Sequence, residues 1–192
     1  MFLGNRICAG IFISVVCLCA GCDAVYKYLD KEGAEEKELI GEALPLERNP
    51  KIEEIQILLN LYGYGSGIPD GVLGFKTRQA IEQFQKDNDL KVTRFVDLAT
   101  WQKLNLFRQN QLIVNNRLNV RLMQKILKVN GYYTGNADGK VGPKTLQAVK
   151  DFQKKHHLKP DGRVGFKTLM ALSTYLKVEA LPAYPPSSQD PQ

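Results

Sequence analysis

The sequence predicts an all-α protein whose folded part consists of two tandem three-helix domains. The first observation is an ungapped match between Ile52–Leu104 and Val120–Leu172, at a constant shift of 68 residues. An ungapped match of this length indicates an internal repeat. The second observation is that each segment holds three stretches with apolar residues at helical spacing, separated by glycine-containing turns. We refer to residues 50–104 as copy 1 and to residues 119–177 as copy 2.

Residues 1–21 have the composition of a secretory signal. Arg6 precedes an apolar run that contains no acidic residue and is shorter than the ~20 residues that span a bilayer. The run ends in LCAGC at residues 18–22, which resembles the lipobox of bacterial lipoproteins, although Cys19 stands where that motif prefers leucine. This resemblance implies that Cys22 carries acyl chains such as palmitate and becomes the first residue of an exported, membrane-anchored protein. The alternative is an ordinary signal, cleaved or uncleaved.

Cysteine usage agrees with export. All four cysteines lie in or at the end of residues 1–22, so no disulfide is expected within the folded part. In lipoproteins of Gram-negative bacteria an aspartate directly after the lipidated cysteine resembles an inner-membrane retention signal, and Asp23 stands at this position. This likeness implies the periplasmic face of the inner membrane.

Residues 22–49 are interpreted as a charged, lipid-anchored tether. The stretch is mostly acidic and is interrupted by Gly33, Gly41 and Pro45. The AEEKELI segment has helical character, but the sequence shows no partner for its apolar side. As a coil the tether would span on the order of 30 Å.

Copy 1 begins at Asn49-Pro50, with Asn as the N-cap and Pro at the first helical position. Asp97 is expected to cap the third helix. Helical spacing predicts the buried side of each of the three helices: Ile52, Ile55, Leu58, Leu59 and Tyr62 in the first, Ala80, Ile81 and Phe84 in the second, and Leu98, Trp101 and Leu104 in the third.

The connector 105–118 is too apolar for a flexible linker, so we expect it to pack against one domain or between the two. Asn119 then caps the first helix of copy 2, Gly131 ends it in a left-handed conformation, and Gly142-Pro143 opens the second helix. The third helix is expected from about Phe166 to Tyr175. Residues 178–192 are interpreted as a proline-rich disordered tail. The predicted core positions are Val120, Met123, Ile126 and Leu127, followed by Thr145, Leu146, Ala148, Val149 and Phe152.

The matched positions resemble the peptidoglycan-binding domain 1 family, a three-helix module. In copy 2 the pattern of this family falls on Gln124, Leu127, Gly131-Tyr132, Asp138-Gly139, Gly142, Thr145, Ala148, Phe152-Gln153, Leu158, Asp161-Gly162, Thr168 and Leu172. Copy 1 carries the same pattern at Gln56 to Leu104, except that KVTRFVD replaces KPDGRVG, so its second Asp-Gly turn is missing. The resemblance implies peptidoglycan as the partner, and the missing turn concerns the ligand-facing loop of copy 1 rather than its fold.

Charge separates the two copies. Residues 51–104 have seven basic and seven acidic side chains, whereas residues 119–178 have twelve basic and three acidic ones, a net charge of +9. A field of this sign attracts anions, which in the cell envelope are stem-peptide carboxylates, wall polymers and lipid head groups. The alternative is a solvated basic face that serves solubility. The secretory signal argues against nucleic acid as the partner.

We expect the ligand-binding residues at the Asp-Gly turns, where cations can pair with carboxylates and tyrosine rings can stack on sugars. Gln85 and Gln153 could contact the ligand or could bond the loop backbone from the helix. Thr77 and Thr145 are interpreted as structural. The expected site in copy 2 comprises Tyr132, Asp138, Gly139, Lys140, Lys144, Lys159, Asp161 and Arg163, and that in copy 1 comprises Tyr64, Asp70 and Gly71.

No catalytic, cofactor or metal site is expected. His156 and His157 are adjacent, and neighbouring residues on a helix would point in different directions. No serine lies in a nucleophile-elbow context. The predicted function is therefore that of a non-catalytic envelope lipoprotein that binds peptidoglycan and tethers it to the membrane through Cys22. One alternative is an envelope scaffold that recruits a wall hydrolase or a secretion component. Another is binding of anionic lipids by copy 2.

Overall fold

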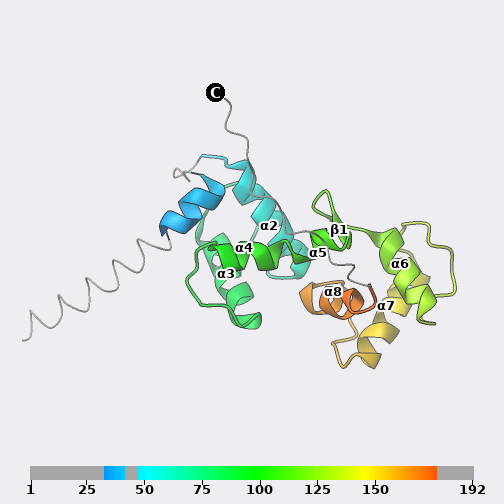
Figure 1. Cartoon of the computed structure of the whole chain (residues 1–192). Coiled ribbons are helices and arrows are strands. Elements are labelled where there is room, and N and C mark those ends of the chain that lie inside the picture. Colours follow the sequence, from blue (N-terminus) through cyan, green and yellow to red (C-terminus); the bar gives the residue numbers. More distant parts are fainter. Residues whose placement is uncertain (1–32, 42–46, 177–192) are drawn as a thin grey trace, which may run out of the picture.

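The computed structural model describes residues 33–41 and 47–176. Each copy contains three helices, and Figure 1 shows the helices of the two copies as two groups. This arrangement confirms the predicted all-α fold with one three-helix domain in each copy. The predicted signal (1–21), Cys22, part of the tether and the predicted tail lie outside the described residues. Among the described residues, no helix has both the length and the apolarity needed to cross a membrane. The helices are α2 (Pro50–Tyr62), α3 (Phe75–Asp87) and α4 (Leu98–Leu104) in copy 1, and α6 (Val120–Val129), α7 (Pro143–Lys155) and α8 (Phe166–Ser173) in copy 2.

The helix ends follow the capping residues. The Asn49 side chain accepts hydrogen bonds from the backbone N–H groups of Lys51 and Ile52, and Pro50 is the first residue of α2. The side chains of Asp97 and Asn119 cap α4 and α6 in the same way. These caps satisfy N–H groups that have no partner within the helix, which is why the helix starts could be predicted.

The cores of the two copies contain nearly all the predicted positions, with two corrections. Leu98 is 53 % exposed and Leu146 is 41 % exposed. Leu98 lies two residues before Thr100, and Leu146 directly follows Thr145. These two threonines, close to the start of their helices, are the residues that point inward. Their hydroxyls are buried because glutamine amides donate to them. At residues 98–100 a buried hydrogen bond has therefore taken the place that helical spacing assigns to Leu98, whereas Thr145 was itself a predicted core position.

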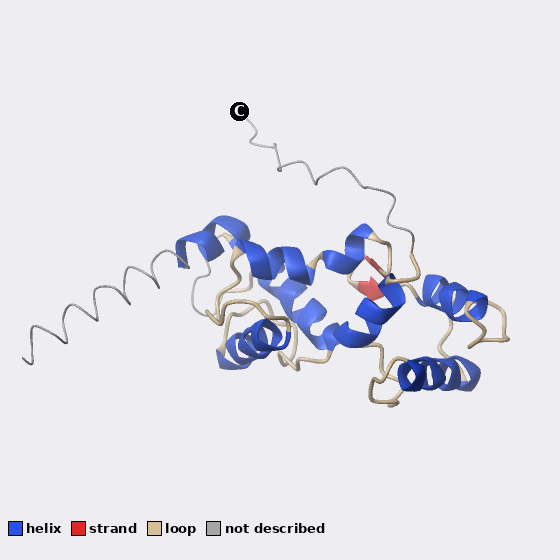
Figure 2. Cartoon of the chain, turned by 60° about the horizontal axis from the view of Figure 1, so that its bottom comes forward, coloured by secondary structure: helices blue, strands red, loops and turns tan. Residues whose placement is uncertain are grey.

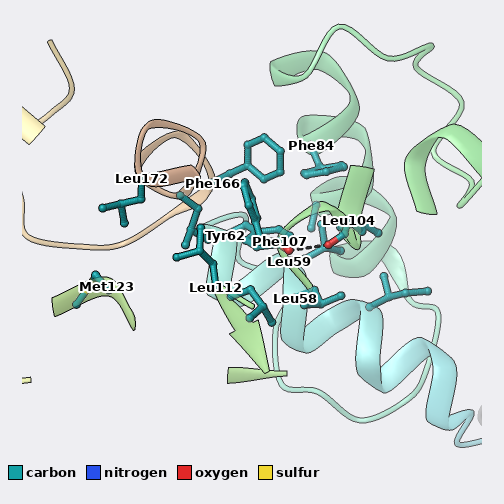
Figure 3. Packing of buried hydrophobic residues seen from close by; sticks show 14 of the residues in the cluster. Leu58, Leu59, Tyr62, Phe84, Leu104, Phe107, Leu112, Met123, Phe166 and Leu172 are labelled. Carbon is teal, nitrogen blue, oxygen red and sulfur yellow. Dashed lines mark hydrogen bonds between the residues drawn. The ribbon is translucent and has the colours of Figure 1, made fainter. Parts of the chain in front are cut away.

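An aromatic cluster joins the two copies. The ring of Phe166, the first residue of α8, packs against Tyr62, Phe84 and Phe107, with centroids 5.2, 5.3 and 5.1 Å away (Figure 3). Tyr62 also donates a hydrogen bond from its hydroxyl to the carbonyl of Leu104 at 2.6 Å. Because Phe166 comes from copy 2 and the other rings come from copy 1 and the connector, the two copies share one continuous core.

The connector packs as expected, and it also contains structure that was not predicted. Its short helix α5 (Leu106–Gln109) is followed by an antiparallel hairpin of β1 (Ile113–Val114) and β2 (Arg117–Leu118), which lies between the two helix groups (Figures 1 and 2). Phe107, Leu112 and Ile113 are buried. Asn115 and Asn116 form the turn, both with positive φ. Two left-handed residues between strands are typical of a type I′ hairpin, and asparagine tolerates this conformation well.

The structure corrects the tether interpretation for residues 33–40. These residues form a helix that packs on copy 1, with Glu36 and Ile40 buried on the same side. Residues four apart share a helix face, so both side chains reach copy 1 together. The carbonyl of Ile40 accepts a hydrogen bond from the Asn49 side chain at 2.8 Å. Copy 1 is therefore the partner for the apolar side of this helix.

Candidate functional site

The candidate site is built on four turns, each held by a buried glutamine. Two glutamines come from the first helices of the copies and two from the second helices. Each one reaches a turn that opens the next helix and a threonine in the first turn of that helix. The four sets are Gln56 with Thr77, Gln85 with Thr100, Gln124 with Thr145 and Gln153 with Thr168.

The first turn of copy 2 shows how the clamp works. The Nε2 group of Gln124 donates to Oδ1 of Asp138 at 3.0 Å, to the carbonyl of Lys140 at 2.9 Å and to Oγ1 of Thr145 at 3.1 Å. Its Oε1 atom accepts the N–H of Gly139 at 2.8 Å. Gly139 has a φ of 81°, a left-handed conformation that favours glycine. One buried amide thus fixes the loop and the start of α7.

The second turn of copy 2 repeats this arrangement. Gln153 Nε2 donates to the carbonyl of Arg163 at 2.8 Å and to Asp161 Oδ1 at 3.3 Å, and Gln153 Oε1 accepts the N–H of Gly162 at 2.8 Å. Gln153 is buried and bonds the loop backbone, which is one of the two alternatives that the sequence left open for this amide.

Copy 1 keeps both clamps although it lacks the second Asp-Gly sequence. Gln56 holds the turn at Asp70-Gly71 as Gln124 does in copy 2. At the second turn, Thr93 replaces aspartate, and its hydroxyl accepts from Gln85 Nε2 at 2.9 Å. Arg94 occupies the left-handed position of the missing glycine with a φ of 67°. The clamp therefore tolerates a different turn sequence because the glutamine bonds mostly to backbone atoms.

The turn aspartates are held in their charged form. The backbone N–H of Lys140, followed by the amide of Gln124, lowers the pKa of Asp138. The N–H of Arg163 is the largest cause of the lowered pKa of Asp161, and the amide of Gln56 is the largest cause for Asp70. Hydrogen bonds of this kind stabilise a carboxylate over a carboxylic acid. The turn carboxylates are thus already committed to internal bonds through one oxygen.

The tyrosines near the first turns of the two copies differ in their surroundings. Tyr64 and Tyr132 are half-buried and lie edge-on to Phe84 and Phe152, with centroids 5.3 and 5.4 Å apart. Tyr133 is buried, and its hydroxyl donates to the carbonyl of Asn136 at 3.1 Å. Only the partly exposed edges of Tyr64 and Tyr132 are available to a ligand.

The predicted cations surround the turns of copy 2 and are solvent-exposed: Lys140, Lys144, Lys159 and Arg163. Among residues 33–41 and 47–176, no cation of copy 2 lies within 4.0 Å of a carboxylate oxygen. Copy 1, in contrast, pairs several of its cations, as in Lys86 with Glu82 and Arg78 with Glu36. The basic face of copy 2 therefore has its charge available for an external anion.

Two arginines near the first turn of copy 2 were missed by sequence reasoning. Arg117 and Arg121 line a shallow hollow together with Leu118, Asn119 and Gly139. Arg117 belongs to β2 and Arg121 to α6. The hairpin brings them together, so recognition of the Asn115-Asn116 turn would have been the signal that placed Arg117 beside Gly139.

Comparison with protein-family models gives one match, which occurs twice. Residues 48–104 and 116–172 match the family described as "Putative peptidoglycan binding domain". Together the two matched segments cover more than half of the chain. No solved structure matches the chain.

Proposed function

We propose, from the premise that this chain belongs to the peptidoglycan binding domain family, that it is a non-catalytic lipoprotein. It binds peptidoglycan through two modules and tethers it to a membrane. The duplicated family match supports the binding activity and a location in the cell envelope. The lipobox-like LCAGC segment at residues 18–22 supports the mooring through Cys22.

Copy 2 is the stronger binding site in this proposal. The observation that carries it is the group of exposed cations around its turns, Lys140, Lys144, Lys159 and Arg163, none of which has a carboxylate within 4.0 Å among the described residues. Peptidoglycan stem peptides carry carboxylates, and charge-assisted hydrogen bonds to carboxylates are the strong ones. Exposed charges of this kind lose attraction as salt screens them.

The shared core changes how two sites act together. Because Phe166 packs among rings of copy 1, the two modules keep a fixed relation. Two linked sites raise avidity only if the ligand can reach both at once. We therefore propose that copy 1 adds weaker contacts through its first turn, at Asp70-Gly71, when the polymer presents a second unit at the spacing that the fixed pair requires.

A co-sedimentation experiment tests the binding. The full-length chain in mild detergent is mixed with insoluble sacculi at low and high ionic strength. Replacing Lys140, Lys144, Lys159 and Arg163 by glutamine should lower the bound fraction severalfold at low salt and leave little salt dependence. The matched control replaces four cations of copy 1, Lys51, Lys86, Lys91 and Lys103, and removes the same net charge. An equal loss in both variants would show attraction by net charge alone, and no sedimentation of the unaltered chain would overturn the proposal.

The membrane attachment has its own test. Mass spectrometry of the protein isolated from membranes should find acyl chains on Cys22 and no residue before it. Fractionation of a Gram-negative host should place the protein in the inner membrane because Asp23 follows Cys22. A mature chain that begins elsewhere, or a Cys22→Ala variant that stays with the membrane, would contradict the lipoprotein part of the proposal.

A second candidate function is a scaffold that recruits a wall hydrolase or a secretion component. It is favoured by Ile68 and Phe75, which belong to neutral copy 1 and are 81 % and 73 % exposed. Large exposed apolar side chains mark interaction surfaces when they gather. If this function holds, Ile68→Ser with Phe75→Ser should abolish co-purification of one defined envelope protein while sedimentation with sacculi persists.

A further inference from the structure

Copy 1 binds a carboxylate of its own chain next to its second turn. Glu36 Oε1 accepts the backbone N–H of Val96 at 2.8 Å. The guanidinium of Arg78 donates to both carboxylate oxygens of Glu36, at 2.6 and 2.7 Å. Glu36 is only 5 % exposed. A bidentate arginine together with a backbone N–H is a typical way to bind a carboxylate, so this position of the module is built to take one.

The guanidinium of this position packs on an aromatic ring. Arg78 lies over the ring of Phe95, with its Cζ atom 4.6 Å from the ring centroid. Phe95 belongs to the second turn and precedes Val96, whereas Arg78 belongs to α3. The carboxylate position of copy 1 thus combines one backbone N–H, one guanidinium and one apolar side chain.

The repeat places the same components in copy 2, with two of them exchanged. At the shift of 68 residues, Val96 corresponds to Val164, Phe95 to Arg163 and Arg78 to Leu146. The guanidinium has moved from the helix to the turn, and the apolar side chain has moved from the turn to the helix. Both copies therefore keep one arginine and one apolar residue beside the same backbone N–H.

The components in copy 2 are available to a ligand. No oxygen among the described residues accepts the N–H of Val164, and the guanidinium of Arg163 has no acceptor among them either. Arg163 is exposed. Lys150 adds a second cation, because a Cβ atom on Gly162 would lie 3.3 Å from Lys150 Cε. The turn between them is rigid, since Gln153 holds the N–H of Gly162 and the carbonyl of Arg163.

We infer that copy 2 binds a ligand carboxylate between the N–H of Val164, Arg163 and Lys150, at the position where copy 1 holds Glu36. This step rests on the proposed function. The carboxylate is then that of a peptidoglycan stem peptide, and the site recognises the stem peptide rather than a hydroxyl of the glycan. Copy 1 does not take a second such carboxylate while Glu36 is in place. The two copies of the module are therefore specialised, and copy 2 is the one that binds the stem peptide.

The test uses two soluble muropeptides that differ only in their stem carboxylates, free in one and amidated in the other. Calorimetric titration of the full-length chain in detergent should show one site for the free form and about tenfold or more weaker binding of the amidated form. The amide signal of Val164 should shift in NMR spectra with the free form only. Arg163→Gln should remove most of this preference, while Lys128→Gln, which removes an exposed cation of α6, should preserve it.

A second variant tests the correspondence between the copies. Glu36→Ala should expose the N–H of Val96 and Arg78, so that the stoichiometry for the free muropeptide rises from one to two. Equal affinity for the two muropeptides, or an unshifted Val164 amide at saturation, would overturn the inference. If sacculi still sediment with the chain in that case, the proposed function stands and only the carboxylate site falls. If sacculi do not sediment but the free muropeptide binds at Val164, the carboxylate site stands and the proposed function falls.

Discussion

The ring of Phe166 in copy 2 lies edge-to-face against the ring of Tyr62 in copy 1, with centroids 5.2 Å apart and planes at 82°. This geometry is a favourable one for aromatic pairs. Phe75 begins α3 as Phe166 begins α8, and both follow the same Asp-Gly-x-x-Gly pattern. Phe75 is nevertheless 73 % exposed, whereas Phe166 is 4 % exposed. The contact between the copies thus gives one of two locally similar residues a structural role.

Phe166→Ala should destabilise the protein by about 3–5 kcal/mol, the usual cost of truncating a buried phenylalanine. Phe75→Ala is the matched control and should change the free energy of unfolding by less than about 0.5 kcal/mol. Urea unfolding measures both. Phe166→Ala should also separate the unfolding of the two copies into two transitions. A single transition at the original midpoint would show that the cluster does not couple them.

Gly165→Ala should be destabilising because of a contact between the copies. A Cβ atom at this position would lie 2.9 Å from the backbone carbonyl oxygen of Tyr62. The backbone of the two copies would have to move apart, which costs about 1–3 kcal/mol as overpacking does. Gly142 is the equivalent glycine in the turn before α7 and has no atom within 4 Å of such a Cβ. Gly142→Ala should therefore have the smaller effect in thermal unfolding, and equal shifts in Tm would contradict the argument.

Local signals were sufficient to predict most of the fold of each copy. Asn49, Asp97 and Asn119 cap helices as their side chains and positions indicated. Phe84 is buried as helical spacing indicated. Helix caps and amphipathic spacing involve only residues that are close together in the chain, so a single sequence is enough to predict them.

The relation between the copies could not be read in this way. Phe166 and Phe75 carry the same local signal, and the burial of Phe166 depends on Tyr62, which lies about a hundred positions earlier in the chain. Glu36 likewise lies in a segment whose sequence is typical of an acidic linker. Its burial depends on Arg78, a distant residue in α3. The Asn115-Asn116 turn was a local signal that could have predicted the hairpin.

The assignment of site residues stays partly a prediction. The structure gives Asp138, Asp161 and their glycines a role in holding the turns. Sequence patterns could not separate this role from ligand binding, because both require the same residues at the same turn. The cations Lys144 and Arg163 are exposed beside these turns, and the binding experiments above decide their role.

Gln153→Glu tests the glutamine clamp with almost no change in volume. The substitution replaces a donor that faces the carbonyl of Arg163 and the carboxylate of Asp161 by a negatively charged acceptor. An uncompensated buried charge costs about 3–5 kcal/mol, so copy 2 should unfold at much lower urea. Gln79→Glu lies on the exposed side of α3 and is the control, with an expected change below about 0.5 kcal/mol. A stable Gln153→Glu protein would show that the clamp is dispensable.

Glu36→Ala should release the helix at residues 33–40 from copy 1. The substitution removes the acceptor for the N–H of Val96 and both bonds from Arg78. The expected loss is about 1–3 kcal/mol, typical of a buried hydrogen-bonded charge. Hydrogen exchange should become faster in residues 33–40 and at Val96. Glu38→Ala removes an exposed carboxylate from the same helix and should leave the exchange rates unchanged. Equal protection in both variants would mean that Glu36 is not needed to hold the helix on copy 1.

Acid should weaken copy 2 through its turn carboxylates. Asp138 and Asp161 have lowered pKa values in the folded state, chiefly because backbone N–H groups donate to them. A lowered folded-state pKa contributes stability that is present above the unfolded-state pKa of about 4 and is lost as the pH falls through the folded-state value. Urea unfolding followed from about pH 6 downward, in the acid range of carboxylates, should therefore show stability falling below about pH 4.

Copy 1 supplies the variant that separates this effect from general acid unfolding. Thr93 stands at the position of Asp161 and holds the equivalent turn with a hydroxyl that does not titrate in this range. Asp161→Thr should thus keep the clamp to Gln153 and make the loss of stability below about pH 4 less steep. Asp151→Thr removes a carboxylate from the exposed side of α7 without altering a turn and should change the steepness less. If Asp161→Thr and the unaltered chain lose stability with the same dependence on pH, the hydrogen bonds at this turn do not link folding to protonation.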